Sequence, residues 1–174
     1  CGFCDAGHSI HCEQGFSLLG VMADGGMAEY IKVPANKLIE LPSGLDVAIA
    51  SLVEPLAVAV HGVDRAQVRE GDRVLIIGAG PIGLAIGAVL RGRGIAYDIT
   101  ARYPHQQQAA ERLGGKLRAD GHYDVVMDAI GSASSLKQAT ARVRPMGRIG
   151  LVGMFWEPTK LEQQFWAKEA VLIP

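Results

Sequence analysis

The stretch Val74-Leu75-Ile76-Ile77-Gly78-Ala79-Gly80-Pro81-Ile82-Gly83 decides the fold. Its first four residues are branched and apolar, which predicts a strand buried on both faces, as in the centre of a parallel sheet. The glycines at 78, 80 and 83 fit G-x-G-x-x-G, and the small apolar residues that follow, to Leu90, are compatible with a helix. A glycine-rich turn between such a strand and such a helix is typical of dinucleotide binding.

Each small residue of this turn has a physical role. Gly78 allows the tight strand-to-helix turn, Gly80 lets the backbone approach a pyrophosphate, and Gly83 lets the helix pack closely on the sheet. Pro81 lacks an N–H where the first helical N–H groups have no partner, and the helix N-terminus attracts phosphate. We therefore expect Gly78, Gly80, Pro81, Ile82 and Gly83 to bind the cofactor.

The chain after this turn alternates between strand and helix. Strands are expected over 95–101, 123–128, 147–153 and 171–174, and helices over 104–113, 135–143 (capped by Ser132) and 161–168. This alternation predicts an α/β fold with a doubly wound parallel (Rossmann) sheet. Ligands bind at the carboxyl ends of such strands, so Ile130, Val152 and Gly153 are expected to flank the nicotinamide.

The region before the turn has a different pattern. The Gly25-Gly26 turn is expected to lead into an alternating strand that ends at Val33, and a second short strand is expected over 37–42. Asp46 is expected to cap a helix over 47–53. A further helix, from Glu54 to about Arg65, is apolar nearly all round and is therefore expected to be buried.

Composition and charge exclude several classes of function. The chain has 174 residues, of which 49% are hydrophobic, and a net charge of −1, so neither nucleic acid nor a membrane is an expected partner. No apolar run free of glycine and charge reaches the roughly 18 residues of a membrane span. The chain opens on Cys1 and ends on Val171-Leu172-Ile173-Pro174, within an expected strand, so we expect a piece of a longer protein.

All three cysteines lie in the first twelve residues, at positions 1, 4 and 12. Cys-x2-Cys lets two thiolates reach one tetrahedral metal, and Cys12 would supply a third ligand. His8, His11 or a cysteine before residue 1 would supply the fourth. The alternatives are a disulfide and a redox pair, although a redox Cys-x-x-Cys normally lies near a βαβ pattern. We expect Cys1, Cys4 and Cys12 to bind zinc.

Glu54 is the one charged residue in Leu52-Val53-Glu54-Pro55-Leu56. An acid in the first turn of a helix interacts favourably with the helix dipole, which requires no functional role. A carboxylate in apolar surroundings is also a candidate site residue. The sequence leaves both interpretations open.

Together these motifs resemble the zinc-containing medium-chain dehydrogenase/reductase superfamily, the alcohol and polyol dehydrogenases. Cys1, Cys4 and Cys12 match the last three cysteines of its structural-zinc lobe, whose first cysteine would lie three residues before this chain. Gly25-Gly26-Met27-Ala28-Glu29-Tyr30 is similar to a family strand, Val53–Ala57 to its E-P element, and 78–83 to its cofactor fingerprint. The resemblance implies a dinucleotide-binding domain, 43–174, after the remnant of a GroES-like β catalytic domain, 1–42, with the zinc lobe in 1–15.

The resemblance also implies a second, catalytic zinc. In the sorbitol and threonine dehydrogenase branch an acid in the E-P element lies at this metal, so Glu54 is expected there as a ligand or a close neighbour. The family's other catalytic ligands, a cysteine near G-x-D-x-H and a G-H-E pair, are not in this sequence. The connection between Gly115 and Tyr123 is shorter than in the family, which leaves little room for the family's third strand.

The choice of nicotinamide cofactor depends on Arg102, which stands 19 residues after Gly83. NAD-selective enzymes place an acid about there to bind the ribose 2′-hydroxyl, whereas a guanidinium suits the 2′-phosphate of NADP. Asp98 comes earlier, in mid-strand, and is expected either to point away from the ribose or to lie too deep to reach it. We expect NADP to be favoured over NAD; the alternative is that Arg102 is a solvated loop residue.

The expected function is reversible zinc-dependent oxidation of a secondary alcohol, such as a polyol, with hydride transfer to NAD(P). Zinc would stabilise the alkoxide. The alternatives are a zinc-free quinone or enoyl reductase of the same superfamily and a non-catalytic dinucleotide-binding remnant. The 174 residues alone are expected to bind dinucleotide weakly and to oxidise no alcohol. A cytoplasmic homodimer or homotetramer is expected for the full-length protein.

Overall fold

The computed structural model describes residues 1–15 and 17–174. The described chain divides into two compact units, Cys1–Gly44 and Leu45–Pro174, each of which is considered by itself. This boundary lies close to the one expected from the sequence, 42/43, while the roles assigned to the two parts stay predictions.

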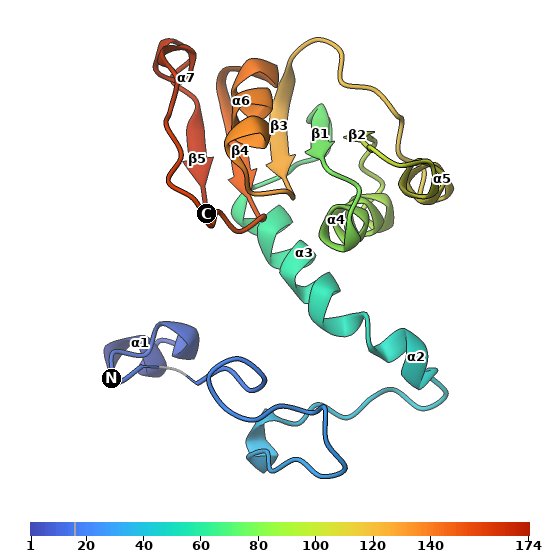
Figure 1. Cartoon of the computed structure of the whole chain (residues 1–174), viewed down its shortest axis with the longest axis vertical. Helices are drawn as coiled ribbons and strands as arrows, with labels where there is room; N and C mark the ends of the chain where they lie inside the picture. Colours follow the sequence, from blue (N-terminus) through green and yellow to red (C-terminus); the bar gives the residue numbers. More distant parts are fainter. Residues whose placement is uncertain (16) are drawn as a thin grey trace. The chain divides into compact units, whose positions relative to one another are not determined.

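The Leu45–Pro174 unit is built on a parallel sheet whose described strands have the order β2-β1-β3-β4-β5 (Figure 1). The strands are β1 (Val74–Ile77), β2 (Tyr97–Thr100), β3 (Tyr123–Asp128), β4 (Val143–Leu151) and β5 (Val171–Ile173), connected by α4 (Pro81–Gly92), α5 (Pro104–Arg112), α6 (Ala133–Arg142) and α7 (Gln163–Ala167). The predicted doubly wound α/β fold is confirmed. Because β1 pairs with both β2 and β3, the strand order reverses beside β1, which is where ligands of such sheets bind.

Helices cover both faces of the sheet, which explains why β1 is apolar throughout. Val74 and Ile76 belong to one core, with residues of α4 and β2. Leu75 and Ile77 belong to a second core on the opposite face, with residues of α6 and β4. Alternating side chains of a strand point to opposite faces, so a strand between two layers of helices has to be apolar at every position.

Two helices precede the sheet: α2 (Val47–Ala50) and α3 (Val53–Arg65). The Asp46 carboxylate accepts a hydrogen bond from the Ala48 N–H (2.8 Å), so the predicted cap is confirmed. The prediction that α3 is buried all round is wrong. Among its described residues only Ala59 and Val63 are buried, and Val53 is 51% exposed, because α3 packs on α4 and β4 along one face only.

By length and apolarity, Val47–Arg65 is the one helical segment of the described chain that would be able to cross a membrane. The core helices of water-soluble proteins meet the same criteria.

The Cys1–Gly44 unit has little regular structure: α1 (Gly2–Asp5) and two short 3-10 helices, η1 (Ser9–His11) and η2 (Ala35–Lys37). The strands predicted up to Val33 and over 37–42 are not formed, and Tyr30 and Ile39 are 91% and 86% exposed. Strand hydrogen bonds need a partner backbone, and within the described residues none pairs with these segments.

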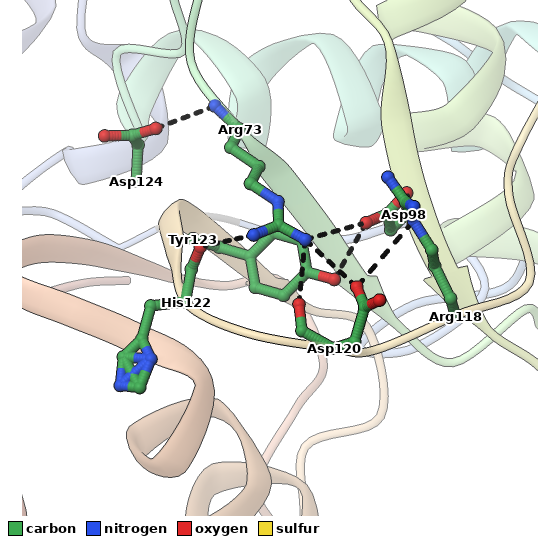
Figure 2. Close-up of polar contacts among 7 residues, drawn as sticks. All are labelled: Arg73, Asp98, Arg118, Asp120, His122, Tyr123 and Asp124. Carbon is green, nitrogen blue, oxygen red and sulfur yellow. Dashed lines mark hydrogen bonds and ion pairs between the residues drawn. The ribbon is translucent and has the colours of Figure 1, made fainter.

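Between β2 and β3 the described chain forms no further strand, only a single parallel bridge between Asp98 and Lys116. Polar side chains hold the short connection that follows (Figure 2). The buried Asp98 carboxylate accepts hydrogen bonds from Arg118 Nε (2.9 Å) and Tyr123 Oη (2.8 Å), and Arg73 pairs with Asp120 (3.0 Å). Burial and the hydrogen bond to Asp98 raise the pKa of Tyr123 to about 12.

Candidate dinucleotide groove and zinc cluster

The turn after β1 has the geometry that its glycines predict. Gly78 has a φ of +97°, in the region that favours glycine. A Cβ on Gly83 would lie 1.8 Å from the Gly78 carbonyl oxygen, so only glycine allows α4 to begin here. Pro81 is the first residue of α4 and Gly80 its N-cap.

Gly80 differs from its neighbours because a Cβ there would meet no atom of the described protein within 4 Å. The need for glycine at this position is therefore not one of internal packing. The Leu84 N–H bonds to the Gly80 carbonyl (2.9 Å), which leaves the first-turn N–H groups of Ile82 and Gly83 for an outside acceptor. An open backbone at a helix N-terminus fits a pyrophosphate.

A cavity of about 520 Å³ opens beside this turn. Its walls come from the turn, the end of β2 and the segment after it, the first turn of α5, the segment after β3, and the middle of α6: Gly78, Ala79, Gly80, Thr100, Ala101, Arg102, Tyr103, Gln106, Ala129, Ile130 and Gln138. The structure therefore brings two of the fingerprint glycines, Gly78 and Gly80, into one cavity with Arg102 and Ile130. We call this cavity the dinucleotide groove.

Ile130 lies directly against the turn, since a Cβ on Gly78 would be 2.6 Å from Ile130 Cγ1. The sequence prediction grouped Ile130 with Val152 and Gly153 at the nicotinamide. The Gly153 backbone does pack on Ile130, but Val152 lines a separate cavity of about 190 Å³ beside His61. Ile130 instead shares the dinucleotide groove with Arg102 and Tyr103.

Arg102 is exposed at the rim of the dinucleotide groove. Its guanidinium lies over the Tyr103 ring, 5.3 Å from the centroid, and that ring stacks on His105 at 5.7 Å. Across the described residues, no carboxylate forms an ion pair with Arg102. Asp98 faces the Arg118 and Tyr123 side chains instead and does not line the groove.

Two residues that the sequence reading did not single out organise the groove. The Thr100 hydroxyl accepts a hydrogen bond from the Gly78 N–H (3.0 Å), which ties the turn to the end of β2. Asp128, fully buried at the end of β3, accepts hydrogen bonds from Ile130 N (2.9 Å), Gly131 N (3.1 Å) and Ser135 Oγ (2.8 Å). The signal available in the sequence was an acid ending an apolar strand and followed directly by Ala-Ile-Gly.

The three cysteines converge in the Cys1–Gly44 unit. The first turn of α1 brings Cys1 and Cys4 together and η1 adds Cys12, with Sγ separations from Cys1 of 3.7 and 3.9 Å. All three are free thiols, so the disulfide considered as an alternative is not present among them. Thiolates on one tetrahedral zinc, with Zn–S of about 2.3 Å, lie about 3.8 Å apart, so this set fits zinc. The described cluster contains neither His8 nor His11.

Glu54 is exposed in the first turn of α3 and belongs to no described group of three or more metal-ligating side chains. One carboxylate does not make a catalytic zinc site, which normally has three protein ligands. The described residues thus fit a structural zinc and not, by themselves, a catalytic one. The catalytic role of Glu54 stays a prediction.

No protein-family model matches this chain. L-galactonate-5-dehydrogenase of Escherichia coli K12 is 30% identical over 190 residues, which cover 99% of this chain and 55% of the relative. A solved structure described as a zinc-binding dehydrogenase from Sinorhizobium meliloti 1021, bound to NADP, superposes with a TM-score of 0.88 at 28% identity and covers 99% of this chain and 56% of that one. This chain is therefore similar to zinc-type alcohol and polyol dehydrogenases.

A second solved structure, described as a short chain alcohol dehydrogenase of E. coli CFT073 complexed with NADH, superposes with a TM-score of 0.89 at 29% identity and covers 99% of this chain and 56% of that one. This chain spans about half the length of the curated relatives that it matches. One of these two solved structures holds NADP and the other holds NADH.

Proposed function

We propose that this chain supplies the cofactor-binding unit and the structural-zinc cluster of a zinc-dependent dehydrogenase. The whole protein would transfer hydride between a polyol or related secondary alcohol and NADP. The observation that carries the proposal is a single groove that joins the open helix N-terminus at Gly80 to the unpaired guanidinium of Arg102 in the described chain.

Residues of the groove, of the adjacent first turn of α4 and of the segment after β4 would each bind a different part of the dinucleotide. The first-turn N–H groups of Ile82 and Gly83 would bind the pyrophosphate, aided by the positive end of α4. Arg102 would pair with the 2′-phosphate, which only NADP carries. Ile130, which lines the same groove as Arg102 and Tyr103, would contact the adenosine half. We place Val152 and Gly153 toward the nicotinamide, at the carboxyl end of β4.

The convergence of the three cysteine thiols supports a structural role for a bound zinc ion. Cys1, Cys4 and Cys12 would hold zinc as three thiolates, and the fourth ligand is left open. A catalytic zinc, when bound, would supply Lewis-acid stabilisation of the alkoxide, and Glu54 would contribute one oxygen near it. The three cysteines and Glu54 favour this function over that of a zinc-free quinone or enoyl reductase of the same superfamily.

The experiment measures cofactor choice by calorimetric titration of the chain with NADPH and with NADH. Arg102→Ala should weaken NADPH binding by roughly tenfold to a hundredfold, because a charge-assisted hydrogen bond worth about 1.5–3 kcal/mol is lost. NADH binding should stay within about twofold, since NADH has no 2′-phosphate. Arg112→Ala, at the end of α5 and outside the groove, is the matched control for lost charge.

Equal losses of affinity for both cofactors in Arg102→Ala would mean that Arg102 contacts a part common to both. The proposal that Arg102 selects NADP would then be rejected. If the wild-type chain bound neither cofactor, the proposal of dinucleotide binding would be rejected. Only the proposal that the three cysteines bind zinc would remain.

Two broader expectations are also proposals: assembly of the whole protein as a homodimer or homotetramer, and a cytoplasmic location. Light scattering on the whole protein after size-exclusion chromatography tests the first.

A further inference from the structure

The carboxylate of Asp128 is fully buried and has no cationic partner in the described chain. Burying an ionised carboxylate is costly unless hydrogen bonds satisfy it. Here the backbone N–H groups of Ile130 and Gly131 bond to Oδ1, and the Ser135 hydroxyl bonds to Oδ2. The acid therefore fixes the 129–131 loop and the first turn of α6 at the same time.

The main chain of Asp128 ties down a second loop. Its carbonyl oxygen accepts hydrogen bonds from Val152 N (2.9 Å) and Gly153 N (2.8 Å), which follow β4. The two loops then cross so closely that a Cβ on Gly153 would lie 2.3 Å from Gly131 N. One residue thus holds both loops at the carboxyl ends of β3 and β4.

The held loop shapes the dinucleotide groove. Ile130 is one of the two residues whose N–H groups bond to the Asp128 carboxylate, and its side chain lies on Gly78 and forms a wall of the groove. We propose that Asp128 is a positioning residue for the dinucleotide: its carboxylate holds Ile130 against the fingerprint turn, in the conformation that receives the adenosine half. This inference rests on the proposed function, because it assumes that the groove binds NADP.

The test is a double-mutant cycle between Asp128→Ala and Ile130→Ala, with NADPH affinity and thermal stability measured for each variant. If Asp128 acts through Ile130, Asp128→Ala should weaken NADPH binding about tenfold, comparable to loss of one charge-assisted hydrogen bond. The double variant should then bind NADPH about as weakly as the weaker single variant. Asp128→Asn keeps one oxygen for the two N–H groups and should restore binding to within about threefold of wild type.

Asp124→Ala provides the matched control for a purely structural effect. Asp124 lies on the same strand, accepts a hydrogen bond from the Arg73 N–H (2.8 Å), and does not line the groove. The Asp124→Ala substitution should lower the melting temperature, while NADPH affinity stays within about twofold of wild type. If Asp128→Ala does not give folded protein, Asp128→Ser replaces it in the cycle, since it keeps a buried polar group that cannot reach both amides.

Additive losses in the cycle, wild-type affinity in Asp128→Ala, or no rescue by Asp128→Asn would each overturn the positioning role. These results are distinct from failure of the proposed function, in which the wild-type chain itself would not bind NADPH.

Discussion

Gly80 and Gly83 are separated by two residues, yet the structure assigns them different requirements for glycine. At Gly83 a Cβ would lie 1.8 Å from the Gly78 carbonyl oxygen, while real Cβ atoms do not come within 3.0 Å of such a neighbour. Because the obstacle is backbone, Gly83→Ala has to move the start of α4 away from the turn. At Gly80 the space beyond the α-carbon is open, so Gly80→Ala should leave the fold in place and fill only the space that a pyrophosphate needs.

The two substitutions should therefore separate stability from binding. Overpacking costs about 1–3 kcal/mol, and a rigid backbone contact places Gly83→Ala near the top of this range. At about 2–4 °C per kcal/mol for a chain of this size, its melting temperature should fall by roughly 6–12 °C. Gly80→Ala should change the free energy of unfolding by less than about 1 kcal/mol, yet weaken NADPH binding by more than about tenfold, or about 1.4 kcal/mol.

Differential scanning fluorimetry and calorimetric titration measure the two effects on the same samples. Gly92→Ala, at the last residue of α4 where a Cβ also meets nothing within 4 Å, is the control and should change neither property adversely. Wild-type NADPH affinity in Gly80→Ala, or a wild-type melting temperature in Gly83→Ala, would refute this division of roles.

Two further predictions concern the metal and the polar network. In the whole protein, Cys4→Ser should lower the zinc content after dialysis and reduce stability, because a thiolate ligand is lost, while NADPH affinity persists; unchanged zinc content would exclude the structural-zinc assignment. The raised pKa of Tyr123, about 12 against about 10 for an unfolded tyrosine, means that the folded state retains a proton that the unfolded chain releases. The free energy of unfolding should therefore fall between about pH 10 and 12, by at most about 1.4 kcal/mol per pH unit, and Tyr123→Phe should lack this component in urea titrations. An unchanged alkaline slope in Tyr123→Phe would contradict the assignment.

The sequence predicted the sheet well because its strands carry their own signal. The run 74–77 has to be apolar at every position between two layers of helices, and Gly78 and Pro81 mark the turn and the helix start by backbone chemistry alone. The cysteine spacing likewise predicted the convergence of Cys1, Cys4 and Cys12, since α1 and η1 are local structures.

The features that the sequence did not predict depend on distant partners. Residues 27–33 alternate as a strand would, but no described backbone pairs with them. The burial of α3 was overestimated because apolar composition does not show on how many sides a helix is packed. The hydrogen bonds of Asp128 depend on the close approach of the loops after β3 and β4, which no local pattern reveals.

The most direct test of the central claim is a crystal structure of this chain with NADPH bound. The account predicts the pyrophosphate on the N–H groups of Ile82 and Gly83, the 2′-phosphate within hydrogen-bond distance of Arg102, and the adenosine half against Ile130. A dinucleotide bound elsewhere, or one that leaves the first turn of α4 without contact, would contradict it.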